Sequence, residues 1–408
     1  MSAERRFPKI TVTKKAEYSI KKGHPWVYDA EITSGAPNEN GELCDVYSSK
    51  DSYLGTGFWS EKSKIRIRLL SSNANERFER SFFERRIKYA VDYRRAVMGN
   101  DFSSCRIIFG EADGMPGLTV DKFSDILVVQ VLSLGMDKIK NMIFDILFET
   151  FDAIGEKISG IYEREDVAIR ELEGLPLFKG WYEKEGRPHP ESTITEICEN
   201  GVKYTVDVEN GQKTGFFLDQ KYNRLAVAKL AKGKRVLDCF THTGSFAMNA
   251  VMGGAARVTA VDVSQSAVDM ARANARLNGI EDKMDFVCAD VFDLLPELEK
   301  GKNSPYDFII LDPPAFTKSR KTASSAYRGY KEINYRAMKL LPRGGFFATC
   351  SCSHFMPSED FVKMLKEAAR DANVELKQIE ARTQGPDHPI LLNVPETDYL
   401  KFYLFQVV

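Results

Sequence analysis

The pattern of apolar and polar positions changes near residue 230. Beyond it, short apolar runs alternate with segments of helical period, starting with a run at 234–240 and a helical segment at 245–252. Strands separated by helices of this length are typical of a parallel, doubly wound sheet covered on both faces. No helix separates the last two runs, at 374–382 and 399–407, so we expect an antiparallel pair at one edge of this α/β sheet.

The first 190 residues follow a different pattern. The N-terminal part contains short strand-like runs between turn residues, with glycines spaced as in a small β-barrel. A helical period follows at 74–99, ending in Gly99 near a C-cap position, and then strands with one helix at 136–150. A proline-rich polar stretch at 184–193 indicates a linker. We therefore expect three domains, at residues 1–72, 73–190 and 191–408.

Composition narrows the class of protein. The 408 residues are 43% apolar and 28% charged, which argues against disorder, collagen-like repeats and coiled coils. No apolar run approaches the roughly 18–20 residues of a membrane span, and the N-terminus lacks the apolar segment of a secretory signal. Seven scattered cysteines without CxxC pairs favour reduced thiols. We expect a cytoplasmic protein with no membrane partner.

Charge is unevenly distributed along the chain. The first 100 residues hold 19 Lys and Arg against 13 Asp and Glu, whereas the remaining 308 hold 38 against 45. A basic module on a nearly neutral chain indicates contact with a polyanion, although an unevenly charged surface explains the numbers equally well. The segment at 62–69 favours the polyanion, because its cations alternate with other residues and would share one face of a strand. We expect the cations to contact nucleic-acid phosphates: Lys62, Lys64, Arg66 and Arg68.

Carboxylates end the successive strands of the α/β region. Ligands of open α/β sheets bind outside the carboxyl ends of the strands. Asp238, Asp262, Asp290 and Asp312 occupy such ends, and Gly244 in the first strand-to-helix turn lets a ligand approach the backbone closely. A single aspartate there would more often be a helix N-cap, but four at successive strands indicate a binding site.

The chemistry of this sheet edge favours one class of ligand. Asp262 is placed to accept ribose hydroxyls, as in dinucleotide folds, and Asp290 is placed to contact an adenine amino group. No GxGxxG motif is present, and Asp238 would repel a pyrophosphate. A ribose-and-adenine ligand that carries a cation, S-adenosylmethionine, suits a site surrounded by carboxylates.

The segment from Asp312 to Phe316 reads Asp-Pro-Pro-Ala-Phe and follows a buried strand. It predicts a stiff turn with few hydrogen-bond donors at the mouth of the site. A planar base could stack on Phe316 while Asp312 accepts hydrogen bonds from its amino edge. Downstream, Lys318, Arg320 and Lys321 could grip a nucleic-acid backbone, and a solvated loop explains them nearly as well.

Two cysteines, Cys350 and Cys352, lie at the carboxyl end of the fifth strand. A metal half-site with His354 lacks further ligands, so we expect no metal centre. Buried core cysteines are the serious alternative. A nucleophile is the third reading, since a thiolate that attacks carbon 6 of a pyrimidine makes carbon 5 able to accept a methyl group. Their position at the mouth of the sheet favours the nucleophile.

Jointly, these motifs carry a specific resemblance. The chain resembles the PUA-domain-containing, class I S-adenosylmethionine-dependent rRNA methyltransferases of bacteria and archaea, and most of all the enzymes that form 5-methylcytosine in large-subunit rRNA. The resemblance spans almost the whole length. It rests on these segments: KGHPWVYDAEI, EADGMPGLTVDKF, TGFFLDQKYNR, VLDCFTHTGSFAMNA, VDVSQSAVDMARANARLNG, FIILDPPAF, CSCSH and DHPILLNVPETDYLK.

This resemblance implies a fold and a set of residue roles. The fold is a PUA-like β-barrel (1–72), an α+β middle domain (73–190) and a Rossmann-like methyltransferase domain (191–408). Four residues at matching positions would help enclose the cofactor: Phe217, Asp219, Gln220 and Arg224. The others would line its amino-acid end (Asp238, Gly244), its ribose (Asp262) and its adenine (Asp290), or face the target base (Asp312).

The resemblance leaves the nucleophile open between two positions. Family members carry Ser-Cys-Ser at this motif, which maps onto Cys352, whereas more distant RNA 5-methylcytosine enzymes carry Thr-Cys-Ser, which maps onto Cys350. We place Cys352 slightly ahead. The distant enzymes also have a second cysteine after the proline of the fourth-strand motif, and this chain has none. Product release here would therefore need another base.

We therefore predict an enzyme that methylates carbon 5 of an extruded cytosine in large-subunit rRNA, as naked RNA or in an assembling subunit. One rival is an amino- or ring-nitrogen methyltransferase acting on guanine or adenine, which needs no cysteine. A second is a non-catalytic RNA-binding assembly factor, which the intact strand-end carboxylates argue against. The exposed-strand content of the N-terminal half is compatible with a homodimer.

Overall fold

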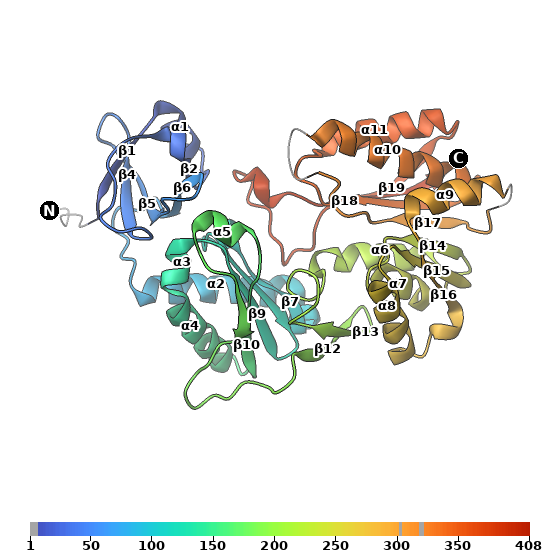
Figure 1. Cartoon of the computed structure of the whole chain (residues 1–408), viewed down its shortest axis with the longest axis horizontal. Coiled ribbons are helices and arrows are strands. Elements are labelled where there is room, and N and C mark those ends of the chain that lie inside the picture. Colours follow the sequence, from blue (N-terminus) through green and yellow to red (C-terminus); the bar gives the residue numbers. More distant parts are fainter. Residues whose placement is uncertain (1–6, 302–303, 318–321) are drawn as a thin grey trace. The chain divides into compact units, whose positions relative to one another are not determined.

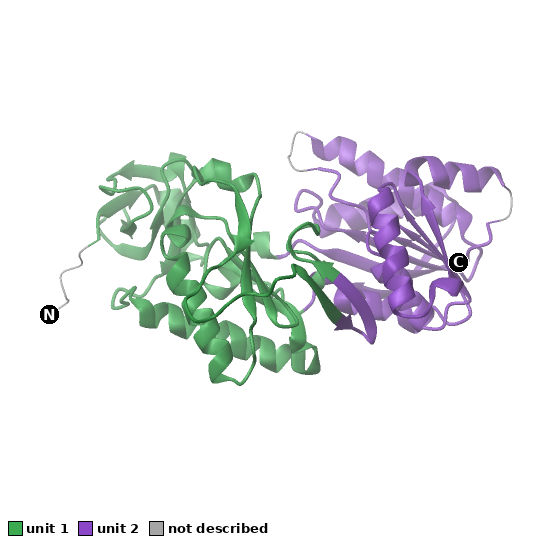
Figure 2. Cartoon of the chain, turned by 60° about the horizontal axis from the view of Figure 1, so that its bottom comes forward, with its two compact units in different colours: residues 1–197, 206–218, 386–397 green, residues 198–205, 219–385, 398–408 purple. Residues whose placement is uncertain are grey.

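The computed structural model describes residues 7–301, 304–317 and 322–408 (Figure 1). The chain divides into two compact units (Figure 2). Unit 1 comprises residues 1–197, 206–218 and 386–397, and unit 2 comprises residues 198–205, 219–385 and 398–408. Both of the first two domains expected from sequence fall within unit 1, so the three-domain division stays a prediction.

The N-terminal part of unit 1 is a six-stranded sheet of order β2-β6-β5-β4-β1-β3 with one helix, α1 (Lys14–Lys21). Its strands are β1 (Lys9–Val12), β2 (Trp26–Tyr28), β3 (Ile32–Ser34), β4 (Leu43–Tyr47), β5 (Tyr53–Trp59) and β6 (Ile65–Ser71). The short strands and turns expected from sequence are therefore confirmed. Apolar side chains from strands and helix, among them Val12, Val27 and Ile67, form one buried cluster inside it.

The remainder of unit 1 is built on a five-stranded sheet of order β11-β10-β9-β8-β7. Its strands are β7 (Ser104–Phe109), β8 (Leu118–Phe123), β9 (Ile126–Val131), β10 (Gly160–Glu165) and β11 (Phe178–Trp181), and its helices are α2 (Arg80–Met98), α3 (Leu134–Lys138), α4 (Lys140–Ala153) and α5 (Ile169–Glu173). Gly99 caps α2 with a positive φ of 52°, as expected. The single helix expected at 136–150 is two helices, because Ile139 leaves the helical conformation.

Unit 2 contains a seven-stranded sheet of order β16-β15-β14-β17-β18-β20-β19. The strands are β14 (Arg235–Cys239), β15 (Arg257–Asp262), β16 (Met284–Cys288), β17 (Phe308–Leu311), β18 (Phe346–Ser351), β19 (Leu376–Arg382) and β20 (Lys401–Val407). The first five are parallel, and β20 is antiparallel to both β18 and β19. The doubly wound sheet and its antiparallel edge pair are therefore confirmed. A two-stranded sheet of β12 (Ile194–Glu199) and β13 (Val202–Asp207) has residues in both units.

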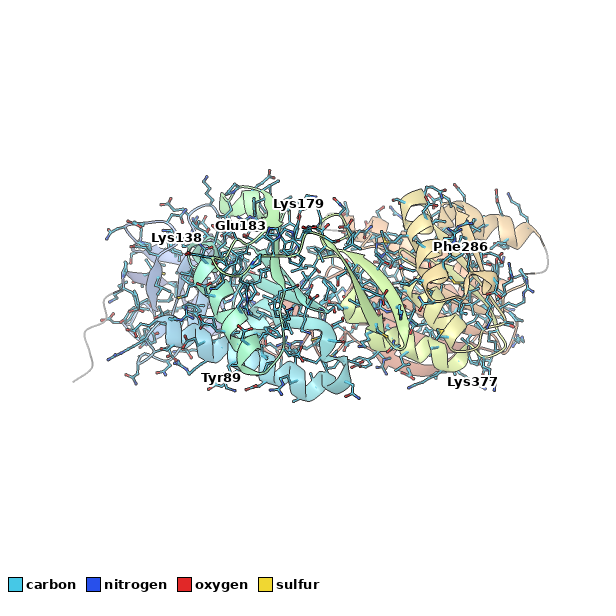
Figure 3. All side chains as sticks on the ribbon, turned by 90° about the horizontal axis from the view of Figure 1, so that it is seen from below. Tyr89, Lys138, Lys179, Glu183, Phe286 and Lys377 are labelled. Carbon is cyan, nitrogen blue, oxygen red and sulfur yellow. The ribbon has the colours of Figure 1, made fainter. Side chains whose placement is uncertain are left out.

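Helices cover both faces of the unit 2 sheet (Figure 1). They are α6 (Lys221–Leu230), α7 (Ser245–Met252), α8 (Gln265–Leu277), α9 (Val291–Lys300), α10 (Ala323–Leu340) and α11 (Ser358–Asp371). The central strands have side chains buried on both faces; all four residues of β17 are fully buried. The edge strands are bordered by polar side chains. Lys377 on β19 is exposed (Figure 3), and the Arg272 guanidinium lies over the ring of Phe286 on β16.

Candidate active site

Four aspartates lie along one edge of the unit 2 sheet. Asp238 is the second-last residue of β14, and Asp262 is the last residue of β15. Asp290 lies two residues after β16, and Asp312 directly follows β17. These four strands are adjacent and parallel, so their carboxyl ends meet at one edge. The sheet order turns back between β14 and β17, which is where open α/β sheets bind ligands. The structure thus brings together the carboxylates that the sequence placed at successive strand ends.

Asp238 offers a buried acceptor. Its side chain is fully buried, and Oδ2 accepts hydrogen bonds from the Thr241 hydroxyl and from the backbone N–H of Ala247, at 3.0 Å. Oδ1 has no hydrogen-bond partner among the described residues. Burial, reinforced by the charge of Asp312, raises the pKa of Asp238 to about 7. A cationic donor at Oδ1 would therefore relieve an unfavourable burial.

The loop between β14 and α7 holds an uncommon backbone conformation. Phe240, His242 and Gly244 have positive φ of 64°, 50° and 81°. Non-glycine residues adopt such angles at a cost, of order 1 kcal/mol or more each, only where their surroundings impose them. At Gly244 a Cβ would lie 2.9 Å from the Met248 Cε and 3.0 Å from the Ala271 Cβ. Glycine is thus required here by backbone conformation and by packing of α7 on α8, in addition to the ligand approach expected from sequence.

Asp262 and Asp290 both bind backbone N–H groups. Asp262 accepts from His242 at 2.9 Å and from Ser264 at 3.0 Å, which fixes its orientation. Asp290 caps α9 by accepting from Phe292 at 2.8 Å, and its side chain is exposed. Capping and ligand binding are compatible, because an ionised carboxylate has about four acceptor positions. The roles of these two residues at a ribose and an adenine stay predictions.

Asp312 is held by a chain of side-chain hydrogen bonds. Gln220 donates from Nε2 to Asp312 at 3.0 Å, and Gln220 Oε1 accepts from Asn223 at 2.6 Å. Arg382 in turn donates to Asn223 at 3.0 Å. Burial and the nearby charge of Asp219 raise the pKa of Asp312 to about 7. The hydrogen bonds therefore fix the orientation of this carboxyl, and burial favours its protonated form.

The other residues expected to enclose a cofactor differ in their surroundings. Asp219 Oδ2 accepts from the Tyr399 hydroxyl at 2.6 Å, and its Oδ1 has no hydrogen-bond partner among the described residues. Arg224 is fully buried and donates to both carboxylate oxygens of Glu199, at 2.5 and 2.7 Å. The structure therefore uses Arg224 for a buried ion pair. Phe217 is half-buried and belongs to unit 1.

The two cysteines have different environments. Cys350 lies within β18 opposite Phe402 and is fully buried, and burial together with the charge of Asp312 raises the pKa of its thiol well above the usual range. Cys352 lies one residue past the end of β18 and is partly exposed. Because β18 is the neighbour of β17, this thiol follows the strand next to that of Asp312. Cys352 is the more exposed of the two residues, whereas the buried Cys350 thiol interacts with the side chains of Gln220 and Asp312.

Phe316 belongs to an aromatic cluster. Its ring centre lies 4.6 Å from that of Tyr330, 5.7 Å from Phe292 and 6.4 Å from Phe240, and it packs against the core of unit 2. The structure therefore gives this ring a packing role, and stacking on a base stays a prediction. The three basic residues expected beside it lie outside the described residues: Lys318, Arg320 and Lys321.

The four cations expected to share one face of a strand do not all lie on β6. The strand begins only at Ile65, so Lys62 and Lys64 precede it; both are exposed. Arg66 pairs with Asp29, and its guanidinium lies 5.4 Å from the ring centre of Trp59.

Arg68 departs furthest from that expectation. It is buried, with nitrogens 3.4 Å from Glu111 and 3.2 Å from Glu173. Carboxylates from distant parts of unit 1, rather than phosphates, neutralise this cation.

Sequence reasoning missed the residues that support the site. Asn223 and Tyr399 lie inside two of the motifs that carry the resemblance, yet their spacing gives no sign that they hold Gln220 and Asp219. Lys401 left a clearer signal, because a lysine begins the largely apolar strand KFYLFQV and is buried there.

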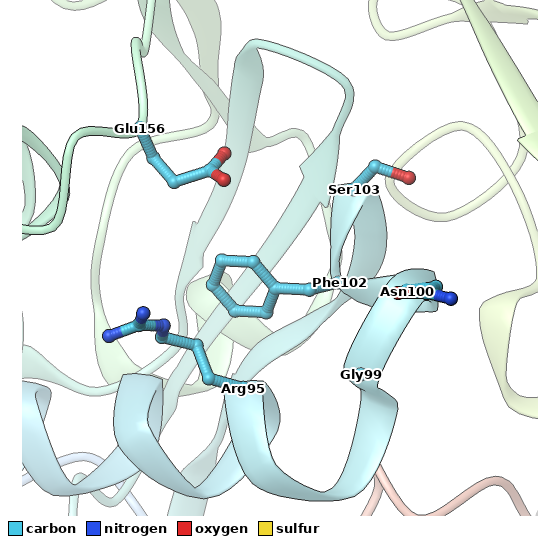
Figure 4. Close-up of a pocket in the computed structure, with 6 residues that line it drawn as sticks. All are labelled: Arg95, Gly99, Asn100, Phe102, Ser103 and Glu156. Carbon is cyan, nitrogen blue, oxygen red and sulfur yellow. The ribbon is translucent and has the colours of Figure 1, made fainter.

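A pocket of about 360 Å³ in unit 1 contains none of the predicted site residues (Figure 4). It is lined by Arg95, Gly99, Asn100, Phe102, Ser103 and Glu156. The carboxylate of Glu156, which lines this pocket, forms an ion pair with Lys122 at 3.3 Å and is therefore already neutralised. Within the described ranges, no helix has both the length and the apolar character that crossing a membrane requires.

Comparisons with known proteins match both parts of the chain. A family described as S-adenosylmethionine-dependent methyltransferase matches residues 185–406, and one described as a PUA-like domain matches residues 10–72. Two curated relatives share the name ribosomal RNA large subunit methyltransferase I. The one from Klebsiella pneumoniae (strain 342) is 38% identical over 405 residues, 98% of this chain and 99% of the relative. The one from Aeromonas salmonicida (strain A449) is 41% identical over 398 residues, 96% and 97% of the two chains.

Solved structures share the fold along almost the whole chain. A protein from Streptococcus mutans, assigned as a SAM-dependent methyltransferase, superposes with a TM-score of 0.80 at 22% identity over 98% of this chain and 99% of its own. A second, assigned as a methyltransferase and solved in complex with SAH, gives a TM-score of 0.81 at 22% identity with the same coverage. These likenesses show a common fold.

Proposed function

We propose a specific reaction for this chain, which belongs to the family of S-adenosylmethionine-dependent methyltransferases that carry an N-terminal PUA-like domain. The reaction is methylation of carbon 5 of a cytosine in large-subunit rRNA, with Cys352 as the nucleophile. The name of the curated relatives supports the rRNA substrate. The partly exposed Cys352, one residue past β18, supports the choice of a pyrimidine carbon.

The residues at the sheet edge fit S-adenosylmethionine, the cofactor of this family. The buried Oδ1 of Asp238, which has no partner among the described residues, suits the amino group of the cofactor's amino-acid part. Asp262, oriented by two N–H groups, is proposed to accept the ribose hydroxyls, and Asp290 to contact the adenine. When bound, the cofactor supplies an electrophilic methyl group.

The chain's own residues would prepare the base for methylation. The Cys352 thiolate forms a bond from Sγ to carbon 6 of cytosine, and the electron pair of the 5,6 double bond makes carbon 5 nucleophilic. After carbon 5 has taken the methyl group, its proton leaves to a base and the S–C6 bond breaks. Asp312, with a pKa of about 7, can donate its proton to the ring nitrogen N3 while its other oxygen accepts from the amino group.

One observation carries the choice of cytosine carbon 5 over a nitrogen. A nitrogen nucleophile needs no thiol, yet Cys352 is partly exposed and follows β18, the neighbour of the strand that Asp312 follows, whereas Cys350 two residues earlier is fully buried. In unit 1, the exposed Lys62 and Lys64 are proposed to bind rRNA phosphates. Such contacts would offset part of the few kcal/mol that extrusion of a base costs.

A mechanism-based substrate tests this proposal. An rRNA fragment carrying 5-fluorocytidine at the target position cannot lose a proton from carbon 5, so it should remain bonded to Cys352 when the cofactor is present. The adduct is detected as a band that survives denaturing electrophoresis, and peptide mass spectrometry locates it. Cys350→Ala should still form the adduct, whereas Cys352→Ala should not.

The outcomes separate the alternatives. An adduct on Cys350 would show that Cys350 is the nucleophile. It would contradict the assignment of Cys352 and support methylation of carbon 5. Full methylation by the double variant Cys350→Ala/Cys352→Ala, with no adduct in the native chain, would favour a nitrogen methyltransferase.

A further inference from the structure

Lys401 is a buried cation with neutral hydrogen-bond partners. It is the first residue of β20, and only 5% of its surface is exposed. Its Nζ donates to the carbonyl oxygens of Ser353, at 2.6 Å, and Tyr399, at 2.8 Å. Burial of an ammonium beside neutral groups is expensive. A nearby anion would therefore stabilise the charged form of this lysine, which the two neutral carbonyl groups do not compensate.

The register of β20 and one hydrogen bond connect this cation to the residues that flank Cys352. Lys401 lies directly opposite Ser351 in the antiparallel pair of β18 and β20. Its ammonium also holds the carbonyl of Ser353. Lys401 thus contacts the chain on both sides of Cys352, just past the end of β18, where this residue is partly exposed.

The electrostatics agree with this placement. Burial lowers the pKa of Lys401 to about 8, while the charge of Cys352 and, more weakly, that of Asp398 act to raise it. At neutral pH the amine therefore still carries its proton, and above about pH 8 it loses it. Asp398 is exposed, so solvent screens its charge.

Two other titratable groups of the described residues act on Cys352. Tyr330 of α10 and Cys350 of β18 both interact electrostatically with Cys352. Burial raises the pKa of Tyr330 to about 12 and that of Cys350 well above its usual range, so both are neutral near pH 7. Asp312, when ionised, would oppose a second negative charge nearby.

We propose that the Lys401 ammonium stabilises the thiolate of Cys352 and thereby sets how much of this nucleophile is reactive at neutral pH. Lys401 is then a positioning residue that acts through Cys352. The inference deepens the proposed function and rests on it for its catalytic meaning. The purely structural alternative is that Lys401 only ties the end of β18 to the start of β20 through two carbonyls. A neutral hydrogen-bond donor would serve that purpose as well.

The test uses the full chain without RNA and measures the reactivity of each cysteine. Iodoacetamide is added between about pH 6 and pH 9, and the alkylation rate of every cysteine peptide is followed by mass spectrometry, since the thiolate is the reacting form. Removal of the cation in Lys401→Met should slow alkylation of Cys352 at pH 7 by roughly tenfold, the equivalent of about one pKa unit. Lys401→Gln, which keeps a donor without charge, should behave like Met, and Lys401→Arg should restore most of the rate.

Two sets of controls make the result specific. The exposed Cys198 and Cys288 are internal references whose rates should not change. Lys122→Met removes another buried lysine, in unit 1, and should leave Cys352 unaffected. If Cys350 becomes reactive in Lys401→Met, this variant has disturbed the core. The comparison of Lys401→Gln with Lys401→Arg then tests the effect of the charge.

An unchanged pH profile of Cys352 in Lys401→Gln would overturn the proposal and leave the structural alternative. Because this measurement needs no RNA, its failure is distinct from failure of the fluorocytidine adduct. If Lys401→Gln lowers the reactivity of Cys352 but the native chain forms no fluorocytidine adduct, the ion pair between Lys401 and Cys352 is supported and the role of Cys352 as nucleophile is contradicted.

Discussion

Strand β6 of unit 1 and the strand-end edge of unit 2 both concentrate like charges in the sequence, but folding treats them differently. In β6, the cation expected to face phosphates, Arg68, is buried against Glu111 and Glu173. At the edge of the unit 2 sheet, Asp238 and Asp219 each keep a buried oxygen without a partner among the described residues.

This difference teaches how a charge pattern can be interpreted. Charges on a strand can be neutralised by any chain segment that packs across them, so their alternation says little about ligands. Carboxylates at the ends of parallel strands meet at an edge that the fold leaves for a ligand. Buried acceptors without partners, rather than the number of charges, identify the binding site.

The largest effect should come from breaking the ion pair in β6. Arg68→Ala leaves Glu173 buried and uncompensated, and we expect unit 1 to lose about 3–5 kcal/mol of unfolding free energy. Lys64→Ala, at an exposed position on the same segment, should change stability little. Urea unfolding followed by tryptophan fluorescence compares the two, since Trp26 lies beside Arg68. Equal stability of both variants would contradict the structural role of Arg68.

The next effect concerns cofactor affinity at the carboxylate edge. Asp238→Asn is nearly isosteric but loses the negative charge, so S-adenosylmethionine should bind roughly 30-fold more weakly, the equivalent of about 2 kcal/mol. Asp290→Asn alters an exposed residue and should cost only a few-fold. Isothermal titration calorimetry measures both dissociation constants. A larger loss in Asp290→Asn would reverse the ranking of buried and exposed acceptors.

A further effect is expected in the pH dependence of stability without cofactor. The folded pKa values of Asp238 and Asp312, about 7, exceed the unfolded value of roughly 3.9. The folded chain therefore binds more protons, and these groups' contribution to stability is lost as the pH rises from about 4 to about 7. The double variant Asp238→Asn/Asp312→Asn should show a flatter decline in melting temperature over this window. A steeper decline would show that the carboxyls are ionised more easily in the folded chain.

The smallest effect should be seen at the exposed cations before β6. Lys62→Ala and Lys64→Ala should each weaken binding of an rRNA fragment a few-fold and lower the slope of log affinity against log salt by about one. Fluorescence anisotropy at several salt concentrations measures this slope. An unchanged slope in both variants would contradict contact between these two lysines and rRNA phosphates.

The sequence alone determined the parts of this protein that depend on local periodicity. Alternating strands and helices predicted the doubly wound sheet, and the missing helix between the last two runs predicted the antiparallel pair β19 and β20. The position of Gly99 predicted the end of α2, because a positive φ favours glycine. Aspartates at strand ends followed from the general rule for parallel sheets, which needs no knowledge of distant contacts.

Only the tertiary structure decided which charges are paired and which thiol is accessible. Arg68 meets Glu173 across 105 residues of sequence, and Arg382 supports Asp312 through side chains from α6 and the turn before it. Cys350 and Cys352 share one motif, yet the first is sealed between β17 and β20 while the second lies past the strand end. Burial and pairing depend on segments that are remote along the chain, so no local pattern can specify them.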